Sequence, residues 1–140
     1  MSTTENPQTP TEALKSVGVH LQLDVEAVEI SPERVVLSLP IGPKVHQPHG
    51  ILHGGVSAVL AESAASVGGS LAAGPGKTVV GIEISASHLR SASAGTLIAT
   101  ATPIRIGRTI QVWRIELRDQ DGRAISDAKC TLAVIDLPAP

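Results

Sequence analysis

The spacing of hydrophobic residues changes along this chain and predicts one long helix between two groups of strands. Gly54–Ala73 consists of small and apolar residues with a single charge, which favours a helix, and Gly74-Pro75-Gly76 is a typical helix end. On both sides of this segment apolar and polar residues alternate, as in half-buried strands. The strands predicted in this way are Leu21–Ile30, Arg34–Leu39, Thr78–Leu89, Thr96–Ile106, Thr109–Arg118 and Arg123–Ile135.

The N-terminal part of the chain gives weaker signals. Residues 1–10 are polar, contain two prolines and are expected to be a disordered tail before one domain at 11–137. Thr11–Val17 is predicted to be a short helix that starts at Thr11 with Glu12 in its first turn. Pro40–Leu52 contains three prolines and two glycines, so we expect a loop with a defined path.

The order of elements predicts the fold. Two strands, a long buried helix and four more strands suit an α+β domain in which a curled antiparallel sheet of about six strands wraps around one central helix. Such a sheet has edge strands, so we expect dimerisation through an edge. We expect the helix to be buried nearly all round. The apolar stripe predicted to face the sheet is Val56, Val59, Leu60, Ala64, Val67 and Leu71. The small far side, predicted to face a close neighbour, is Ala58, Ala61, Ala65 and Gly68.

Composition narrows the class of protein. The net charge of -2 over 140 residues, without a basic cluster, argues against nucleic acid as a partner. No apolar run is expected to cross a membrane, and the N-terminus lacks the features of a signal peptide. The single Cys130 excludes an internal disulfide, so we expect a cytoplasmic protein. Trp113 is the one aromatic residue, so a binding pocket must have mainly aliphatic walls.

Glu62 is the only charged residue between His53 and Lys77. A carboxylate inside an apolar helix is disfavoured in its charged form, and such residues often do chemistry. At about 100° per residue, Glu62 shares one flank of the helix with Ser66 and Gly69, with Gly55 at the amino end of that flank. The alternative is a structural ion pair between Glu62 and an arginine.

The start of the helix offers a complementary feature. His53-Gly54-Gly55 presents unpaired N–H groups at the positive end of the helix dipole, where a carbonyl oxygen would be polarised as in an oxyanion hole. With a carboxylate further along the helix, this arrangement suits acyl transfer. His46, His49 and His53 could also be read as a metal cluster, but no carboxylate or cysteine joins them in the sequence, so we expect no metal site.

Several sequence blocks together resemble the hotdog-fold acyl-CoA thioesterases of the phenylacetate and 4-hydroxybenzoyl-CoA group. Within this group the chain is most similar to the 1,4-dihydroxy-2-naphthoyl-CoA hydrolase branch. The similarity extends over roughly residues 15–136. The blocks that carry it are Gln47–Gly55, Leu60–Ser63 with Ser66, Val79–Ile84, His88–Ser91, Gln111–Trp113 and Asp121–Arg123.

The resemblance implies a role for each matching residue. Glu62 would be the catalytic carboxylate, as nucleophile or as base, and Gly54 would polarise the thioester carbonyl through its N–H. Gln47 and His53 would assist around that carbonyl and the leaving thiolate, and Ser66 would hold the hydrolytic water. In this family the active site lies at a dimer interface, dimers usually pair into tetramers, and CoA is part of the substrate, so no separate cofactor is expected.

The resemblance also implies contacts with CoA. Arginine side chains at these positions suit the phosphates of CoA because their guanidinium groups are forked donors. The residues that match nucleotide-contacting positions are Gly81, His88, Leu89, Arg90, Ser91, Arg105, Ile106, Gly107, Arg108, Thr109 and Ile110.

The expected function is therefore an acyl-CoA thioesterase acting on an aroyl-CoA, with 1,4-dihydroxy-2-naphthoyl-CoA of menaquinone biosynthesis as the candidate substrate. Where family members often carry aromatic residues, this chain has His49 and Ser70, which leaves Trp113 as the one residue that could stack on a flat acyl group. Two alternatives remain open: an acyl-thioester hydratase or dehydratase, in which His53 would pair with Glu62, and a non-catalytic acyl-CoA-binding module.

Overall fold

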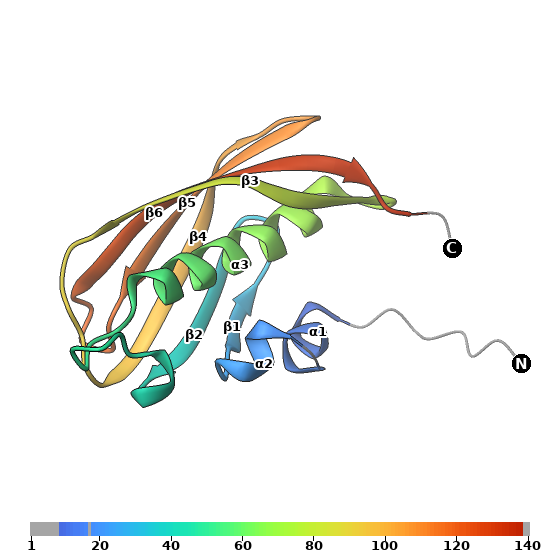
Figure 1. Cartoon of the computed structure of the whole chain (residues 1–140). Helices are drawn as coiled ribbons and strands as arrows, with labels where there is room; N and C mark the ends of the chain where they lie inside the picture. Colours follow the sequence, from blue (N-terminus) through green and yellow to red (C-terminus); the bar gives the residue numbers. More distant parts are fainter. Residues whose placement is uncertain (1–8, 17, 139–140) are drawn as a thin grey trace, which may run out of the picture.

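A computed structural model of the chain describes residues 9–16 and 18–138, and a curled sheet around a long helix dominates it (Figure 1). The helices are α1 (Pro10–Ser16), α2 (Val19–Gln22), the short 3-10 helix η1 (Pro43–Val45) and α3 (Gly54–Ala73). The strands are β1 (Glu26–Ile30), β2 (Val35–Ile41), β3 (Lys77–His88), β4 (Gly95–Ile106), β5 (Ile110–Arg118) and β6 (Ala124–Asp136).

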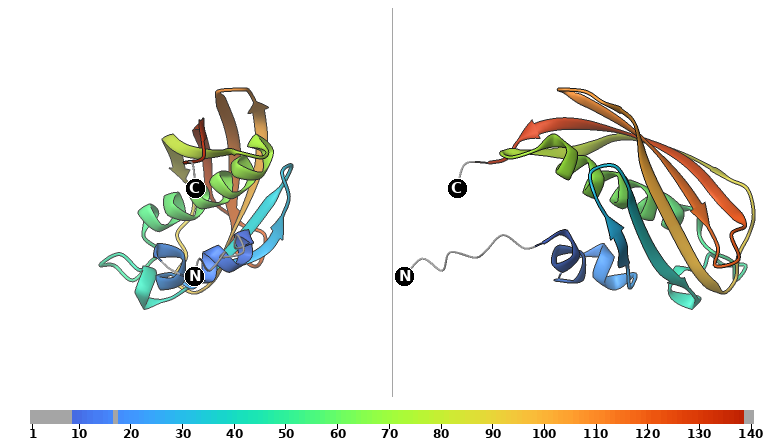
Figure 2. Two further views of the ribbon diagram at one scale, coloured as in Figure 1. Left: turned by 90° about the vertical axis from the view of Figure 1, so that its right-hand side faces the viewer. Right: turned by 180° about the vertical axis from the view of Figure 1, so that it is seen from behind.

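The six strands form one antiparallel sheet in the order β1-β2-β4-β5-β6-β3. α3 lies in the hollow of the curled sheet, and α1 and α2 lie beside it near β1, as the views in Figures 1 and 2 agree. β1 and β3 are the edge strands. The predicted α+β fold, with about six antiparallel strands around a central helix, is confirmed.

The bounds of α3 agree with the prediction, and those of the last four strands agree within one residue. The prediction of a strand over Leu21–Ile30 is wrong in its first half, because α2 occupies Val19–Gln22 and β1 begins only at Glu26. Asp24 adopts a left-handed conformation with φ 56°, which interrupts an extended path at this point. β2 extends two residues beyond the predicted end, to Ile41.

α1 starts at Pro10, one residue earlier than predicted, because its cap is Thr9 and not Thr11. The Thr9 N–H donates to Glu12 Oε2 at 2.8 Å and the Glu12 N–H donates to Thr9 Oγ1 at 3.2 Å, a complete capping box. Hydrogen bonding of the Glu12 carboxylate to the Thr9 backbone N–H, and to the Thr9 side chain, holds the pKa of Glu12 below its usual value. Val17 and the predicted tail at residues 1–8 lie outside the described residues.

The predicted faces of α3 are only partly right. Leu60 and Ala64 of the predicted stripe are buried, but Leu71 is 39% exposed and Val59 and Val67 face away from the sheet. Three residues of the predicted far side are buried instead: Ala61, Ala65 and Gly68. The reason lies in the sheet: Trp113 is fully buried below α3, and a Cβ atom at Gly68 would be 2.6 Å from Trp113 Cη2. Only small residues allow the helix to approach this closely. The buried residues of α3 are Ser57, Leu60, Ala61, Ala64, Ala65, Gly68 and Gly69.

By length and hydropathy alone α3 is long and apolar enough to cross a membrane, contrary to the expectation that no apolar run of this chain could do so. Its buried residues pack on the sheet, which identifies it as the central helix of the fold. The helix is buried on one side and not nearly all round.

Candidate active site

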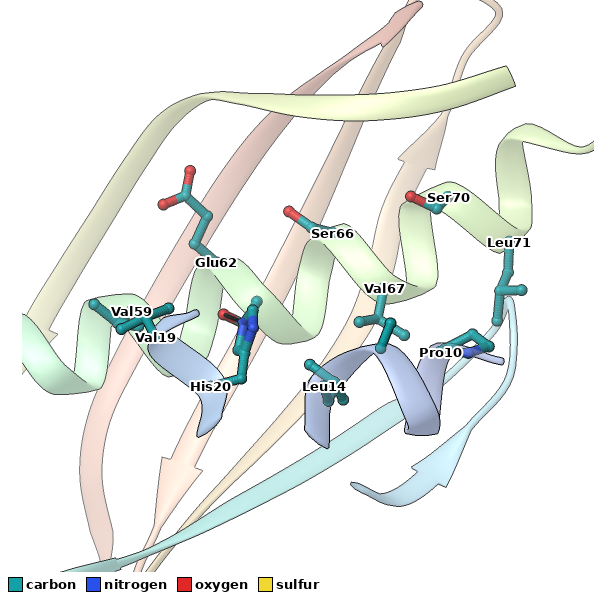
Figure 3. A pocket seen from close by; sticks show the side chains of 12 residues that line it. Pro10, Leu14, Val19, His20, Val59, Glu62, Ser66, Val67, Ser70 and Leu71 are labelled. Carbon is teal, nitrogen blue, oxygen red and sulfur yellow. Dashed lines mark hydrogen bonds between the residues drawn. The ribbon is translucent and has the colours of Figure 1, made fainter. Parts of the chain in front are cut away.

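Glu62 lies near the middle of α3, is half-buried, and points toward β3 (Figure 3). Its carboxylate takes no hydrogen bond or ion pair from any residue that the structure describes, so the structural ion pair with an arginine is not formed within this part of the chain. Gly81 on β3 gives the carboxylate room, because a Cβ atom at Gly81 would be only 3.1 Å from Glu62 Cδ and closer still to Oε1.

Two serines follow Glu62 on the same side of α3 (Figure 3). Ser66 lies one turn further along, and its hydroxyl bonds to no other group within residues 9–16 and 18–138. Ser70 Oγ is 3.2 Å from Thr78 Oγ1 on β3, so it helps to join helix and sheet. Gly69 lies two turns beyond Glu62 and is buried against Val79 of β3 and against Gln111 and Leu132 of the sheet.

The start of α3 presents polar N–H groups. His53 is the N-cap, and its Nδ1 accepts the Gly55 N–H at 2.8 Å. Because Nδ1 is the acceptor, the proton of the neutral ring is on Nε2, which leaves Nε2–H as a donor on an exposed side chain. In the described chain the Gly54 N–H has no acceptor. Two donors are thus available at the positive end of a 20-residue helix.

A groove of about 390 Å³ at this end contains Gln47, Gly54 and residues 88–91. The Gln47 side chain accepts a hydrogen bond from the His49 N–H through Oε1, so its NH₂ group is left to donate. The His88 ring covers Gly54, where a Cβ atom would be 2.7 Å from His88 Nε2. The structure therefore brings Gln47 and Gly54, which were predicted to bind the thioester carbonyl, together with residues 88–91, which were predicted to bind CoA.

Other residues that were predicted to bind CoA lie at the opposite end of α3, away from this groove. Residues 106–109, in the turn between β4 and β5, line a cavity of about 530 Å³ with Ala72, Ala73 and Lys77. Lys77, which the sequence analysis missed, forms an ion pair with Asp136. Its position directly after Gly74-Pro75-Gly76 was the signal that could have identified it.

Gly54 and Glu62 are also separated. They are eight positions apart on one helix, which corresponds to about 12 Å along the axis. One carbonyl group is too small to contact both within one chain. Gly81 was also predicted to contact CoA. It lies beside Glu62 and does not line the groove that contains residues 88–91.

A cavity of about 690 Å³, larger than the two described above, lies between α3 and the two N-terminal helices (Figure 3). Its walls are mainly apolar, with Leu14 and Val19 on one side and Val59 and Val67 on the other. Glu62 and Ser66 are at its rim on the side of β3. The sequence analysis missed this cavity because it placed a strand where α2 is.

Trp113 is not placed to stack on a ligand. It is fully buried, and its ring N–H donates to Gln111 Oε1 at 2.9 Å. The expectation that it could contact a flat acyl group is therefore wrong. Cys130, also buried, has its pKa raised to about 11 by burial and by the carboxylates of Glu62 and Glu83.

The three histidines of the loop do not gather around one point. His46 Nε2 donates to the Ser93 carbonyl at 2.8 Å, and His53 caps α3. Within the part of the chain that the structure describes, no group of three or more His, Cys, Asp or Glu side chains is close enough to hold a metal ion.

An antiparallel sheet curled around one helix is the hotdog fold, and the carboxylate and free N–H groups on that helix are groups that catalyse acyl transfer. The chain belongs to the Thioesterase superfamily, whose family profile matches residues 49–126. It is thus a hydrolase of the thioesterase type.

Relatives in this family include proteins named as 1,4-dihydroxy-2-naphthoyl-CoA hydrolase. One from Listeria monocytogenes is 43% identical over 118 residues, which cover 84% of this chain and 96% of that protein. One from Escherichia coli is 39% identical over 127 residues, covering 89% and 93%. A proofreading thioesterase, EntH, from Cronobacter turicensis is 38% identical over 121 residues, covering 86% and 88%. The crystal structure of a thioesterase from Haemophilus influenzae superimposes with a TM-score of 0.87 at 38% identity, covering 96% of both chains.

Proposed function

We propose that the protein hydrolyses aroyl-CoA thioesters in an active site that two copies of the chain build together. The observation that carries this proposal is the pair of unsatisfied groups on α3: the unpaired carboxylate of Glu62 and the free N–H of Gly54. Because they are about 12 Å apart along one helix, a second copy must bring them to the same carbonyl.

The edge strand β3 supports this pairing. Glu62 faces β3, whose outer edge carries no partner strand in the described chain. The same strand also carries two exposed apolar side chains, Val80 and Ile82. If two copies pair β3 to β3, their α3 helices run antiparallel side by side. A two-fold axis at the level of Ala58 then places the partner subunit's Gly54 opposite Glu62, because 58 is midway between 54 and 62. A tetramer of two such dimers stays a prediction.

The same pairing suits CoA. With the axis at Ala58, the amino end of α3 in one copy lies opposite Glu62 of the other, about 16 Å along the axis from the carboxyl end of that helix. An extended CoA would span this distance between residues 88–91 of one copy and residues 106–109 of the other, where Arg90 and Arg108 would offer forked donors to its phosphates. Arg105 lies next to the end of β4 and Ile110 begins β5, so they flank this turn on its two sides.

In the reaction, the Gly54 N–H and the Gln47 NH₂ would donate to the thioester oxygen as negative charge develops on it. Glu62 would either attack the carbonyl carbon or remove a proton from a water held at Ser66. The carbon–sulfur bond then breaks, and the CoA thiolate leaves near His53 Nε2–H. In the first case water must afterwards cleave an anhydride at Glu62.

The acyl group would occupy the apolar cavity between α3 and the N-terminal helices, since Glu62 is at its rim. The volume of this cavity, about 690 Å³, is in the range of small-molecule sites. The names of the relatives from Listeria and Escherichia coli support 1,4-dihydroxy-2-naphthoyl-CoA, and hence menaquinone biosynthesis, as the candidate substrate and pathway. A cytoplasmic location stays a prediction.

The test is release of free thiol from benzoyl-CoA by the wild type and by Glu62→Ala and Glu62→Gln. We expect both variants to lose activity on the order of 1,000-fold, which is the contribution of a positioned nucleophile or base. Glu33→Gln is the matched control, because Glu33 is exposed in the turn between β1 and β2. Glu62 variants with wild-type rates would refute the proposal.

Two further measurements separate the alternatives. Addition of water to crotonyl-CoA without release of thiol would favour a hydratase, and CoA binding without thiol release from any acyl chain would favour a binding module. Single turnover in ¹⁸O-labelled water distinguishes the two roles of Glu62, because label appears in its carboxylate only if it attacks the thioester.

A further inference from the structure

The wall of the 690 Å³ cavity contains one imidazole, that of His20 on α2. His20 Nε2 is 2.7 Å from Ser63 Oγ on α3, and this hydrogen bond joins the N-terminal helices to the central helix. The other side chains near it in Figure 3, Leu14, Val19 and Val59, are apolar. His20 is thus a polar group in an otherwise apolar part of the cavity, opposite the rim where Glu62 lies.

The His20 ring is suited to neutral hydrogen bonding. Burial lowers its pKa below the ordinary value of 6.5, so at pH 7 and above the ring is mainly uncharged. An uncharged imidazole has one donor and one acceptor nitrogen. Ser63 satisfies Nε2, whereas Nδ1 has no hydrogen-bond partner among residues 9–16 and 18–138.

The polarity of a ligand that covers His20 determines whether Nδ1 has a hydrogen-bond partner. An entirely apolar acyl group would remove water from Nδ1 without replacing its hydrogen bond, which is unfavourable. A hydroxyl group can donate or accept, so it satisfies Nδ1 in either tautomer of the ring. A site of this kind discriminates against analogues that lack the hydroxyl, because the polar group of the protein is then left unpaired.

We propose that His20, positioned by Ser63, is a specificity-determining residue that recognises a hydroxyl group on the acyl part of the thioester. This inference rests on the proposed function, because it requires that the acyl group occupies the cavity at Glu62. It adds that the preference for hydroxylated over unsubstituted aroyl groups depends on one side chain of α2.

The experiment compares kcat/KM for 3-hydroxybenzoyl-CoA and 4-hydroxybenzoyl-CoA with kcat/KM for benzoyl-CoA, in the wild type and in His20→Leu. The ratio within one protein does not depend on the fraction of correctly folded enzyme. We expect the wild type to prefer at least one hydroxylated ester, and His20→Leu to reduce that preference by about 3- to 10-fold, the effect of one neutral hydrogen bond.

Two more variants keep the test decisive if His20→Leu does not fold. Ser63→Ala removes the group that positions His20 and replaces it by a strong helix former, so α3 should persist while the preference falls. His20→Gln keeps a donor and an acceptor and should retain part of the preference, which a purely structural role of His20 would not produce.

The inference is overturned if neither hydroxylated ester is preferred by the wild type, or if the preference is unchanged in both His20→Leu and Ser63→Ala. Its failure differs from that of the proposed function. Unchanged ratios together with loss of thiol release in Glu62→Ala would refute only the role of His20. Retained thiol release in Glu62→Ala would refute the proposed function.

Discussion

Replacing Gly81 by alanine should damage catalysis without destabilising the fold. A Cβ atom at Gly81 would be 3.1 Å from Glu62 Cδ and closer to Oε1, so the carboxylate must move by about 1 Å to restore normal contacts. A misplacement of that size can lower a rate on the order of 100-fold. The backbone at Gly81 does not require glycine, since its φ is not among the positive values, and Glu62 is flexible and half-exposed on its other side. The free energy of unfolding should therefore stay the same or increase by about 0.5–1 kcal/mol, as for other compatible Gly→Ala changes.

The assay measures kcat and KM for benzoyl-CoA together with thermal unfolding. Gly42→Ala is the matched control, because a Cβ atom there meets no atom within 4 Å and its φ of -163° is extended. We expect kcat to fall in Gly81→Ala and to stay unchanged in Gly42→Ala. A rise in KM with unchanged kcat would show that Gly81 acts on the substrate and not on Glu62. Unchanged kinetics would refute the reasoning that the catalytic carboxylate needs the space above Gly81.

Two other predictions concern the core. Gly68→Ala should lower the free energy of unfolding by about 1–2 kcal/mol, measured by denaturant titration. The clash of the new methyl group with Trp113 outweighs the gain of up to about 1 kcal/mol in helix propensity. A stabilised variant would show that α3 can shift away from the sheet. The Cys130 thiol should not react with a chromogenic disulfide at pH 8 in the folded protein, yet react fully after unfolding, since it is buried with a pKa of about 11. Because an exposed thiol titrates near 9 and the folded one near 11, the unfolded state loses its proton first, and stability should fall as the pH rises through this range.

Local sequence signals were sufficient for α3 and the strands after it. Long alternation and a Gly-Pro-Gly segment are properties of neighbouring residues, so the bounds could be predicted within one residue. The prediction of one strand over Leu21–Ile30 was wrong in its first half because the alternation of Leu21, Leu23 and Val25 also suits one helical turn followed by a strand. Contacts distant in sequence decided between the two, among them the His20–Ser63 hydrogen bond.

The orientation of α3 shows what the sequence pattern omits. Placing the largest apolar side chains toward the sheet is a sound rule only when the sheet leaves room for them. Here Trp113 on β5 and Leu132 on β6 fill that room, and Gly68 and Gly69 are the residues that fit. The available volume depends on side chains more than 40 positions away, so no periodicity within the helix could reveal it.

The candidate site was predicted in parts. The pairing of a helix start with a single carboxylate follows from the chemistry of residues 53–62 alone, whereas the residues for CoA came only from the resemblance to a family. The structure groups residues 88–91 with Gln47 and Gly54, but it places residues 106–109 at the other end of α3. The role of His20 had no sequence signal, because it depends on α2 lying against α3.

The separation of Gly54 and Glu62 leads to a last prediction, which tests the division of the site between two copies. Gln47→Ala and Glu62→Ala should each be strongly impaired on their own, since one lacks a carbonyl donor and the other the carboxylate. In a mixed dimer, the Glu62 of one copy faces the intact Gln47 and Gly54 of the other, so one of the two sites is complete. Dimers purified through two different affinity tags should thus recover about half of the wild-type activity per dimer. If the site lay within a single chain, every site in the mixed dimer would carry one defect, and its activity would not exceed that of the parents.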